Sequence, residues 1–213
     1  MLGAGGHASV AASVLRDQGI SIAGIYAKTP ASSSDIFAGI PFFFDDGDPP
    51  PFECTDFDLV NGLGSLPGKN ARVDLHKRFK RLGFKFLTVV APTSVVSEYA
   101  KLEEGVHILH RAVINAGAHI GVSTIVNTGA IVEHDCKIGD HNHLAPGCTV
   151  SGGVSTGDNV HIGVGASVIQ GLSIGSNVLI AAGATAVNNI EPSDSLYPAK
   201  PFLLKKSRRT DEI

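Results

Sequence analysis

An aliphatic side chain recurs at every sixth position through the second half of this 213-residue chain. A period of six matches neither an α-helix nor the alternation of an ordinary strand, and it is typical of a hexapeptide β-solenoid. Thr156 is the only interruption of the series. The other positions are Leu102, Ile108, Ile114, Ile120, Val126, Val132, Ile138, Leu144, Val150, Ile162, Val168, Ile174 and Ile180.

Three hexapeptides make one triangular coil in such a solenoid. Each aliphatic side chain points inward and stacks on its equivalent one coil away, about 4.8 Å along the axis. No charged residue occupies an inward aliphatic position between residues 102 and 186, so we expect a packed core and not a pore. We therefore predict an all-β left-handed parallel β-helix over residues 91–190.

Residues 1–90 lack this repeat and have a different sequence pattern, in which strand-like and helix-like segments alternate. This alternation predicts a small parallel α/β domain. We expect residues 29–55, rich in Pro, Ser, Asp and Gly, to be mostly loops, and residues 191–213 to form a C-terminal tail. The predicted elements are helices over Ala8–Gln18 and Ala71–Leu82 and strands over Ile20–Tyr26, Asp58–Asn61 and Phe84–Val90.

Composition argues against several kinds of partner. The net charge of -3 gives no electrostatic reason to expect nucleic acid or an anionic membrane. No apolar run approaches the roughly 20 residues that span a bilayer, and no signal-peptide pattern opens the chain. The 3 cysteines are odd in number and lack CxxC spacing. We therefore expect a cytoplasmic protein without a disulfide framework.

Functional residues should lie at outward positions that the repeat does not require, and His134 is one of these. His134 and Gly152 are three hexapeptides apart, which places them at one angular position on adjacent coils. A histidine beside a backbone N–H is what acyl transfer needs: a base for the attacking group and a donor for the oxygen that becomes negative. Asp135 could support the imidazole. Because the side chains of successive residues diverge, Asp135 could instead serve a neighbouring subunit.

His143 and His161 are also three hexapeptides apart and should stack. A surface histidine ladder without function is one interpretation of this pair. A zinc site at a subunit interface, with ligands from His141, His143 and His161, is another. The metal hypothesis leaves Glu133, His134 and Asp135 without a role, and we do not expect a metal.

The glycine-rich segment near the start of the chain resembles a turn that cradles phosphate. Gly3, Gly5 and Gly6 precede His7 and the first predicted helix. Backbone N–H groups in such a turn approach a diphosphate closely, and the helix dipole favours the anion. A plain tight turn is the alternative, since the segment is not a complete GxGxxG.

Four segments together resemble the family of sialic acid O-acetyltransferases and UDP-4-amino-sugar N-acetyltransferases. The resemblance covers nearly the whole chain. It is carried by Gly3-Ala-Gly-Gly-His-Ala8, Val60-Asn-Gly-Leu-Gly-Ser65, Val89-Val-Ala-Pro-Thr-Ser94 and Val132-Glu-His-Asp-Cys-Lys-Ile-Gly139. It implies a Rossmann-like domain that holds a nucleotide sugar and a β-helix that forms a homotrimer and binds acetyl-CoA between subunits.

The same resemblance implies roles for individual residues. His134 corresponds to the catalytic base, Asp135 to its acidic neighbour, Gly152 to the oxyanion glycine and His143 to a histidine near the acetyl group. The acetyl-CoA side includes His143, Gly152, Val164 and Ala182, the last at a position that is often glycine. The sugar side includes Gly3, Gly5, Gly6, His7, Gly64 and Ser65.

One departure from the family pattern concerns the nucleotide. UDP-sugar members end the second strand in an aspartate, whereas the corresponding segment here is Ile25-Tyr-Ala-Lys28. The carrier nucleotide, the sugar and the choice between N- and O-acetylation stay open. We expect an acetyl-CoA-dependent sugar acetyltransferase that works by direct attack. The alternatives are a β-helix metalloenzyme of the carbonic anhydrase type and a non-catalytic protein that binds sugar or CoA.

Overall fold

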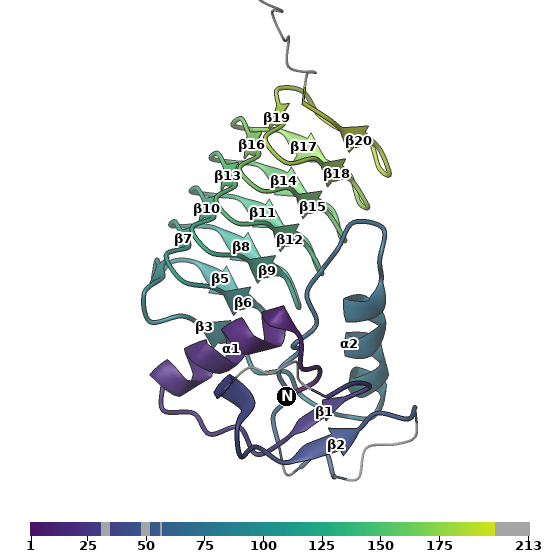
Figure 1. Cartoon of the computed structure of the whole chain (residues 1–213). Coiled ribbons are helices and arrows are strands. Elements are labelled where there is room, and N and C mark those ends of the chain that lie inside the picture. The colour runs from purple at the N-terminus through teal and green to yellow at the C-terminus, as the bar shows by residue number, and fades with distance from the viewer. Residues whose placement is uncertain (31–34, 48–51, 56, 199–213) are drawn as a thin grey trace, which may run out of the picture.

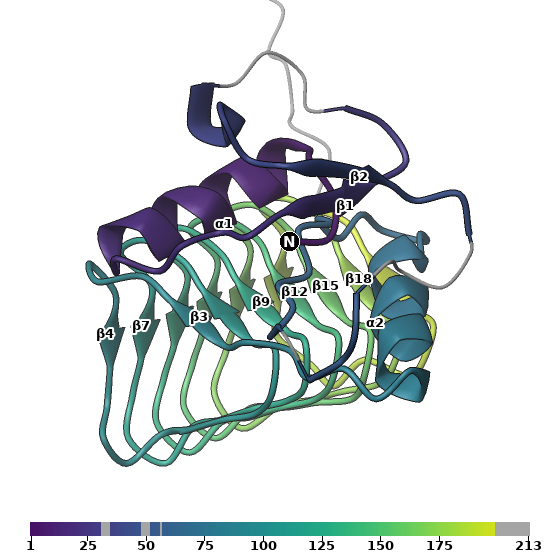
Figure 2. The same ribbon diagram turned by 90° about the horizontal axis from the view of Figure 1, so that it is seen from below.

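The computed structural model describes residues 1–30, 35–47, 52–55 and 57–198. It is a parallel β-solenoid of the left-handed β-helix type, with a smaller N-terminal unit packed against one face (Figures 1 and 2). We use the name N-terminal unit for the described residues that precede β3. Part of the predicted tail, residues 199–213, lies outside the described residues.

Three parallel sheets form the faces of the prism, and each sheet takes one strand from every coil. The first sheet contains β3 (Val89–Val90), β6 (His107–Ile108), β9 (Ile125–Val126), β12 (His143–Leu144), β15 (His161–Ile162), β18 (Leu179–Ile180) and β20 (Ser195–Leu196). The second contains β4 (Val95–Val96), β7 (Val113–Ile114), β10 (Ile131–Val132), β13 (Thr149–Val150), β16 (Ser167–Val168) and β19 (Thr185–Ala186). The third contains β5 (Lys101–Leu102), β8 (His119–Ile120), β11 (Lys137–Ile138), β14 (Ser155–Thr156) and β17 (Ser173–Ile174).

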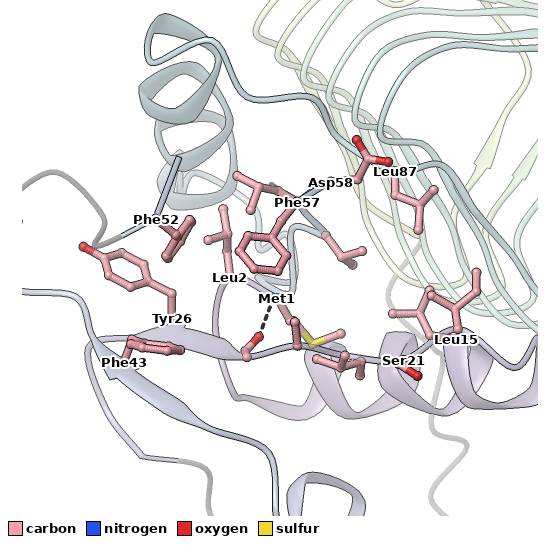
Figure 3. Close-up of a pocket in the computed structure, with 16 residues that line it drawn as sticks. Met1, Leu2, Leu15, Ser21, Tyr26, Phe43, Phe52, Phe57, Asp58 and Leu87 are labelled. Atoms are coloured by element: carbon pink, nitrogen blue, oxygen red, sulfur yellow. Dashed lines mark hydrogen bonds between the residues drawn. The ribbon is translucent and has the colours of Figure 1, made fainter. Parts of the chain in front are cut away.

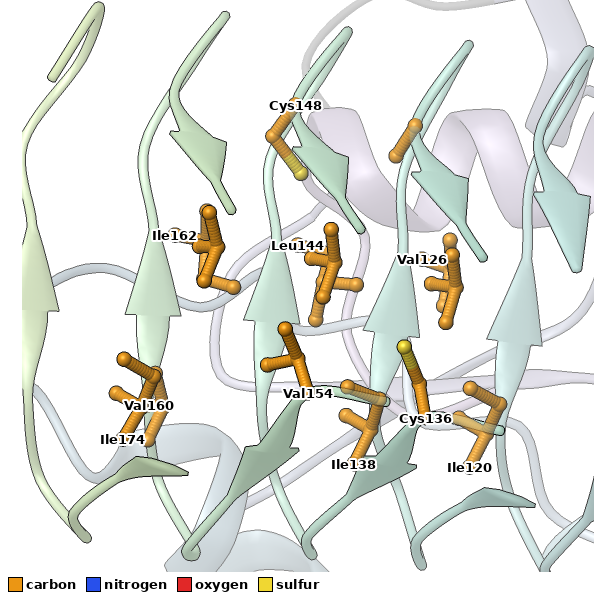
Figure 4. Packing of buried hydrophobic residues seen from close by; sticks show 14 of the residues in the cluster. Ile120, Val126, Cys136, Ile138, Leu144, Cys148, Val154, Val160, Ile162 and Ile174 are labelled. Atoms are coloured by element: carbon orange, nitrogen blue, oxygen red, sulfur yellow. The ribbon is translucent and has the colours of Figure 1, made fainter. Parts of the chain in front are cut away.

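The predicted register of three hexapeptides per coil is confirmed. Ile131 pairs with Thr149, and Val132 pairs with Val150. The second residue of most strands points inward, and these side chains stack along the axis (Figure 4). Cys136 and Cys148, each one residue before a strand, lie in the same core. Burial of this column supplies the main stabilisation, at about 25 cal/mol per Å² of apolar surface.

Thr156 breaks the aliphatic series because its hydroxyl has polar neighbours inside the coil. Its Oγ1 accepts hydrogen bonds from the Gly139 N–H at 3.0 Å and from Asn142 Nδ2 at 2.6 Å. The buried Asn142 also bonds the carbonyl of Gly157 and the N–H of Val160. A valine at position 156 would leave the Asn142 amide without one of these partners, which explains the interruption.

The N-terminal unit contains α1 (Gly6–Asp17), β1 (Ile25–Ala27), the 3-10 turn η1 (Asp35–Phe37), β2 (Phe42–Phe44) and α2 (Ala71–Arg81). β1 and β2 pair in parallel, and isolated parallel bridges join Leu2 to Tyr26 and to Asn61. Helix α1 packs through Ala11, Val14 and Leu15 on the outer side of the first sheet.

The described part of the stretch from residue 29 to 55 is mostly loop, as expected, but it also holds η1 and β2, a strand whose apolar run of three phenylalanines is too short to indicate a strand from sequence. Three predicted strands were wrong in detail. The predicted strand over Asp58–Asn61 is present only as isolated bridges at Leu59 and Asn61. The predicted strand over Ile20–Tyr26 is shorter and lies at Ile25–Ala27. The predicted strand over Phe84–Val90 is split into a bridge at Phe86 and β3. The two predicted helices are confirmed within two residues at each end.

Candidate active site

His134 and Asp135 form a hydrogen-bonded pair at the corner that follows β10. The distance from His134 Nδ1 to Asp135 Oδ2 is 2.9 Å. The side chains were expected to diverge, but Asp135 adopts a left-handed backbone conformation with φ 60°, which turns both side chains to the same side. Aspartate tolerates this conformation better than most residues. The carboxylate favours the tautomer with hydrogen on Nδ1, and Nε2 is then the free acceptor.

Gly152 lies beside the free nitrogen of His134, one coil further along. A Cβ atom at position 152 would be 2.6 Å from His134 Nε2, so only glycine fits the present ring position. Among the described residues, none accepts a hydrogen bond from the Gly152 N–H, whereas the N–H of Gly153 is bonded to the carbonyl of His134. The pair is open to solvent, with 66% of the His134 side chain and 72% of the Asp135 side chain exposed. A base and an unbonded amide therefore lie side by side at an open corner.

His143 lies on the opposite side of the prism from His134. It is half a coil further along the chain, and it belongs to the sheet that carries the N-terminal unit. Its Nε2 is 3.1 Å from Asn127 Nδ2, and its ring meets that of His161 edge-on with centroids 4.8 Å apart. Burial, with the charges of His161 and Arg72, lowers the pKa of His143 to about 4. One chain therefore does not bring His143 and His134 together.

The predicted sugar-side residues gather on the face that holds His143. Gly3 has φ +92°, and added Cβ atoms at Gly5 and Gly6 would meet nothing within 4 Å, so the loop before α1 is open. The Ser65 backbone lies beside the His143 ring. A Cβ at Gly64 would be 3.5 Å from the Cβ of His7, so the two glycine-containing loops are adjacent.

The ring of His7 is directed at the outer face of the first sheet, against β6. It stacks on His107 with centroids 5.1 Å apart, and its Nε2 is 3.1 Å from His107 Nδ1. Burial is the main cause that lowers the pKa of His7 to about 3, with smaller contributions from the positive charges of Arg72 and His143. The His7 side chain thus fixes the loop to β6. Gly5 and Gly6 are the exposed part of the loop, whereas the Gly3 N–H donates to the carbonyl of Tyr26.

Arg72 is a residue of this region that sequence reasoning missed. Its buried guanidinium donates to the carbonyls of Asn61, Leu63 and Ser123 at 2.6, 2.7 and 3.2 Å. These bonds tie the loop that leads to Gly64 to a corner of the solenoid. Arg72 was expected only as part of the predicted helix over Ala71–Leu82. His107 has a sequence signal that was overlooked, because it lies two coils before His143 and shares its ladder.

Val164 and Ala182 lie on adjacent coils at a corner different from that of His134. They are one coil apart, both are exposed, and Val164 has 56% of its surface open to solvent. The carbonyl of Val164 accepts the N–H of Gly183 at 2.9 Å. Within one chain this exposed corner does not converge with His134 and Gly152.

The cysteines in the solenoid are not placed for nucleophilic attack. Cys136 and Cys148 are buried in the core. Burial raises the pKa of Cys148 to about 12 and is the main cause that raises the pKa of Cys136. A buried thiol with a raised pKa stays protonated and unreactive.

The three histidines of the metal hypothesis do not meet. His141 packs edge-on against His76 with centroids 5.1 Å apart, whereas His143 packs against His161. Within residues 1–30, 35–47, 52–55 and 57–198, no three His, Cys, Asp or Glu side chains gather in a way that could hold a metal ion. In the same residues, no helix is long and apolar enough to cross a membrane.

A separate pocket of about 600 Å³ lies within the N-terminal unit and is mostly apolar (Figure 3). Leu15, Phe57, Leu59 and Leu87 are among the residues that line it. It is on the amino-terminal side of β1, away from the loop at Gly3 to Gly6. Ligands of parallel α/β units bind at the carboxyl ends of the strands, so this pocket is not at the position expected for such a ligand.

The solenoid and the His134–Asp135 pair next to a free glycine amide together define the class of β-helix acyltransferases. No protein-family model matches the sequence. Among solved structures, PerB from Caulobacter crescentus in complex with CoA and GDP-perosamine is 33% identical, with a TM-score of 0.78 over 91% of this chain and 90% of that one. The acetyltransferase domain of PglB from Neisseria gonorrhoeae in complex with acetyl coenzyme A is 28% identical, with a TM-score of 0.78 over 94% and 97%.

Sequence comparison finds shorter matches to curated proteins. GDP-perosamine N-acetyltransferase of Escherichia coli O157:H7 is 34% identical over 70 residues, which are 33% of this chain and 32% of that protein. The chain spans about a third of the length of the curated relatives that it matches. Given its likeness to PerB over nine-tenths of both chains, this chain belongs to the hexapeptide-repeat acyltransferase family.

Proposed function

We propose that the protein transfers the acetyl group of acetyl-CoA to the amino group of a nucleotide-linked amino sugar. The observation that carries this proposal is the corner at His134, where Asp135 holds Nδ1 and leaves Nε2 beside the free N–H of Gly152. Two relatives that support it are named as N-acetyltransferases of GDP-perosamine, a nucleotide-linked amino sugar.

The chain's own groups suffice for the proton and charge movements of direct attack. Nε2 of His134 takes the proton from the amine as its nitrogen forms a bond to the acyl carbon. The Gly152 N–H donates to the acyl oxygen, on which negative charge develops. Asp135 stabilises the imidazolium that results, and His134 returns the proton to the departing sulfur. Acetyl-CoA supplies the acetyl group as a thioester and leaves as the thiol.

The acceptor would bind to the N-terminal unit, which we propose is a Rossmann-like domain over residues 1–90. The open glycine loop from Gly3 to Gly6 lies at the N-terminus of α1, where backbone N–H groups and the helix dipole favour a diphosphate. Gly64 and Ser65 lie next to this loop. In this division, residues 91–190 form the acetyltransferase domain and residues 191–213 the tail, although the first sheet of the solenoid extends one strand beyond each boundary, to β3 and to β20.

The placement of these residues argues for a homotrimer with the active site between subunits. The sugar loops and His143 are on one side of the prism, and His134 is on the other, half a coil away. A site that uses His134 together with His143 and the sugar loops needs two copies of the chain. In a closed cyclic trimer, every copy forms the same interface with each of its neighbours. The exposed corner at Val164 and Ala182 would then meet His134 of a neighbouring copy. We expect this assembly to work in the cytoplasm.

The experiment that tests the chemistry replaces His134 by alanine. Thiol release from acetyl-CoA in the presence of GDP- or UDP-linked amino sugars should fall in kcat by about 10²- to 10⁴-fold, the usual contribution of a general base. The KM for acetyl-CoA should change little, because the ring meets the acceptor. His119→Ala is the matched control, since His119 is also half-exposed on the solenoid and its ring is bonded to a carboxylate, that of Glu103. Full turnover of His134→Ala in the folded oligomer would contradict the mechanism.

A further inference from the structure

Gly117 lies directly beside the Asp135 carboxylate, one coil before it. A Cβ atom at position 117 would collide with Asp135 Oδ1. The backbones are fixed relative to each other at this point, because the N–H of Asp135 donates to the carbonyl of Ala116 at 3.0 Å. The His134–Asp135 pair is thus flanked by a glycine on each neighbouring coil, with Gly152 against the ring and Gly117 against the carboxylate.

A left-handed backbone alone does not explain glycine at position 117. Gly117 has φ +75°, but other left-handed corner positions of this solenoid hold Ser123, Asn159 and Asn177. At the equivalent corner position one coil beyond Asp135, Gly153 would carry a Cβ in open space. What sets Gly117 apart is the carboxylate that occupies the volume of its missing side chain.

Little else holds the carboxylate in place. The Asp135 side chain is 72% exposed. Within the described part of the chain, its one side-chain hydrogen bond is to His134 Nδ1. An exposed carboxylate that loses its resting place rotates into water at little cost, and the imidazole then loses the group that sets its tautomer.

We infer that Gly117 is a positioning residue, which acts on the reaction by giving the Asp135 carboxylate the space from which it orients His134. The kinetic part of this inference rests on the proposed function. Its structural part, that position 117 controls the His134–Asp135 hydrogen bond, does not depend on any activity.

The test compares Gly117→Ala with Gly129→Ala. Gly129 has φ +66° and a Cβ there would meet nothing within 4 Å, so the control carries the same backbone strain without the contact. Gly117→Ala should lower kcat roughly 10- to 100-fold, as loss of an orienting partner does, with the KM for acetyl-CoA unchanged. Gly129→Ala should stay within about twofold of the wild type in kcat. Equal kinetics of the two variants would overturn the inference.

A double-mutant cycle shows whether Gly117 acts through Asp135. Asp135→Gly removes the carboxylate and suits the φ of 60° at that position. In the Asp135→Gly background, Gly117→Ala should cost no further activity, because the volume it enters is empty. If the double variant instead lost kcat by the product of the two single-variant reductions, Gly117 would act by another route and the proposal would be wrong.

Two further measurements keep the inference testable if activity or folding fails. Nitrogen-15 correlation spectra of the imidazole should show the Nδ1–H tautomer of His134 in the wild type and in Gly129→Ala, and its loss in Gly117→Ala. An unchanged tautomer in Gly117→Ala refutes the inference even if no acyl acceptor is found. If Gly117→Ala does not fold, Gly117→Asn replaces it, because asparagine occupies two left-handed corners of this solenoid.

Discussion

Replacing Gly152 by alanine should disable the base and spare the fold. The added Cβ would be 2.6 Å from His134 Nε2, whereas such atoms normally approach to about 3.5 Å. The deficit of about 0.9 Å must be taken up by the ring, because Gly152 belongs to the hydrogen-bonded coil and the imidazole is 66% exposed. The ring moves at little cost, and its bond to Asp135 is strained or broken as it does so.

The expected loss follows from that displacement. A misplacement of about 1 Å in a reacting group costs on the order of 10²-fold in rate, which corresponds to about 2.7 kcal/mol of transition-state stabilisation. The backbone itself accepts alanine, because the equivalent corner position two coils earlier is Ala116. The melting temperature should therefore stay close to that of the wild type.

The assay is steady-state thiol release at saturating acetyl-CoA, with a thermal melt of each variant. Gln170→Ala is the matched control, since Gln170 occupies the same corner one coil beyond Gly152 and is exposed. That control should keep its kcat. A Gly152→Ala protein with wild-type kcat would refute the argument that the ring needs the space at Gly152, and a large drop in melting temperature would refute the argument that only the ring moves.

Two further predictions concern assembly and acid. Light scattering should give a mass three times the 22.1 kDa of one chain, and a monomer mass would contradict the shared site. Burial lowers the folded-state pKa of His7 to about 3 and of His76 to about 4. Below pH 6.5 the unfolded chain therefore binds more protons than the folded one. The free energy of unfolding should decrease as the pH drops from about 6.5 to 4, by up to about 1.4 kcal/mol per pH unit for each histidine. Thermal melts from pH 7 to 4.5 check this: His7→Gln should show a shallower decline, and a flat profile in the wild type would contradict the burial argument.

The solenoid could be predicted from sequence because its period is a property of the chain and needs no knowledge of distant contacts. Position along the repeat fixes both the direction of a side chain and its neighbours one coil away, and this placed Gly152 beside His134. The parts of the fold outside the repeat were harder. Strand β2 has only three apolar residues and becomes a strand because β1 is available to pair with it.

The details of the site depended on backbone conformation, which the repeat does not encode. The convergence of His134 and Asp135 follows from the left-handed φ at Asp135. The direction of the His7 ring toward the first sheet follows from a tertiary contact with His107, 100 residues away. Separation of His143 from His134 by half a coil was available from the spacing alone, and it is the main reason to expect a site made by two subunits.

The central claim is that this protein moves an acetyl group onto the amine of a nucleotide-linked sugar. The most direct measurement incubates the protein with acetyl-CoA and a panel of GDP- and UDP-linked amino sugars and follows the sugar by mass spectrometry. We predict that one nucleotide sugar gains a single acetyl group on nitrogen, with one free thiol formed for each molecule acetylated, and that His134→Ala forms this product about 10²- to 10⁴-fold more slowly. Thiol release without an acetylated sugar, or no turnover with any member of either series, would contradict the claim.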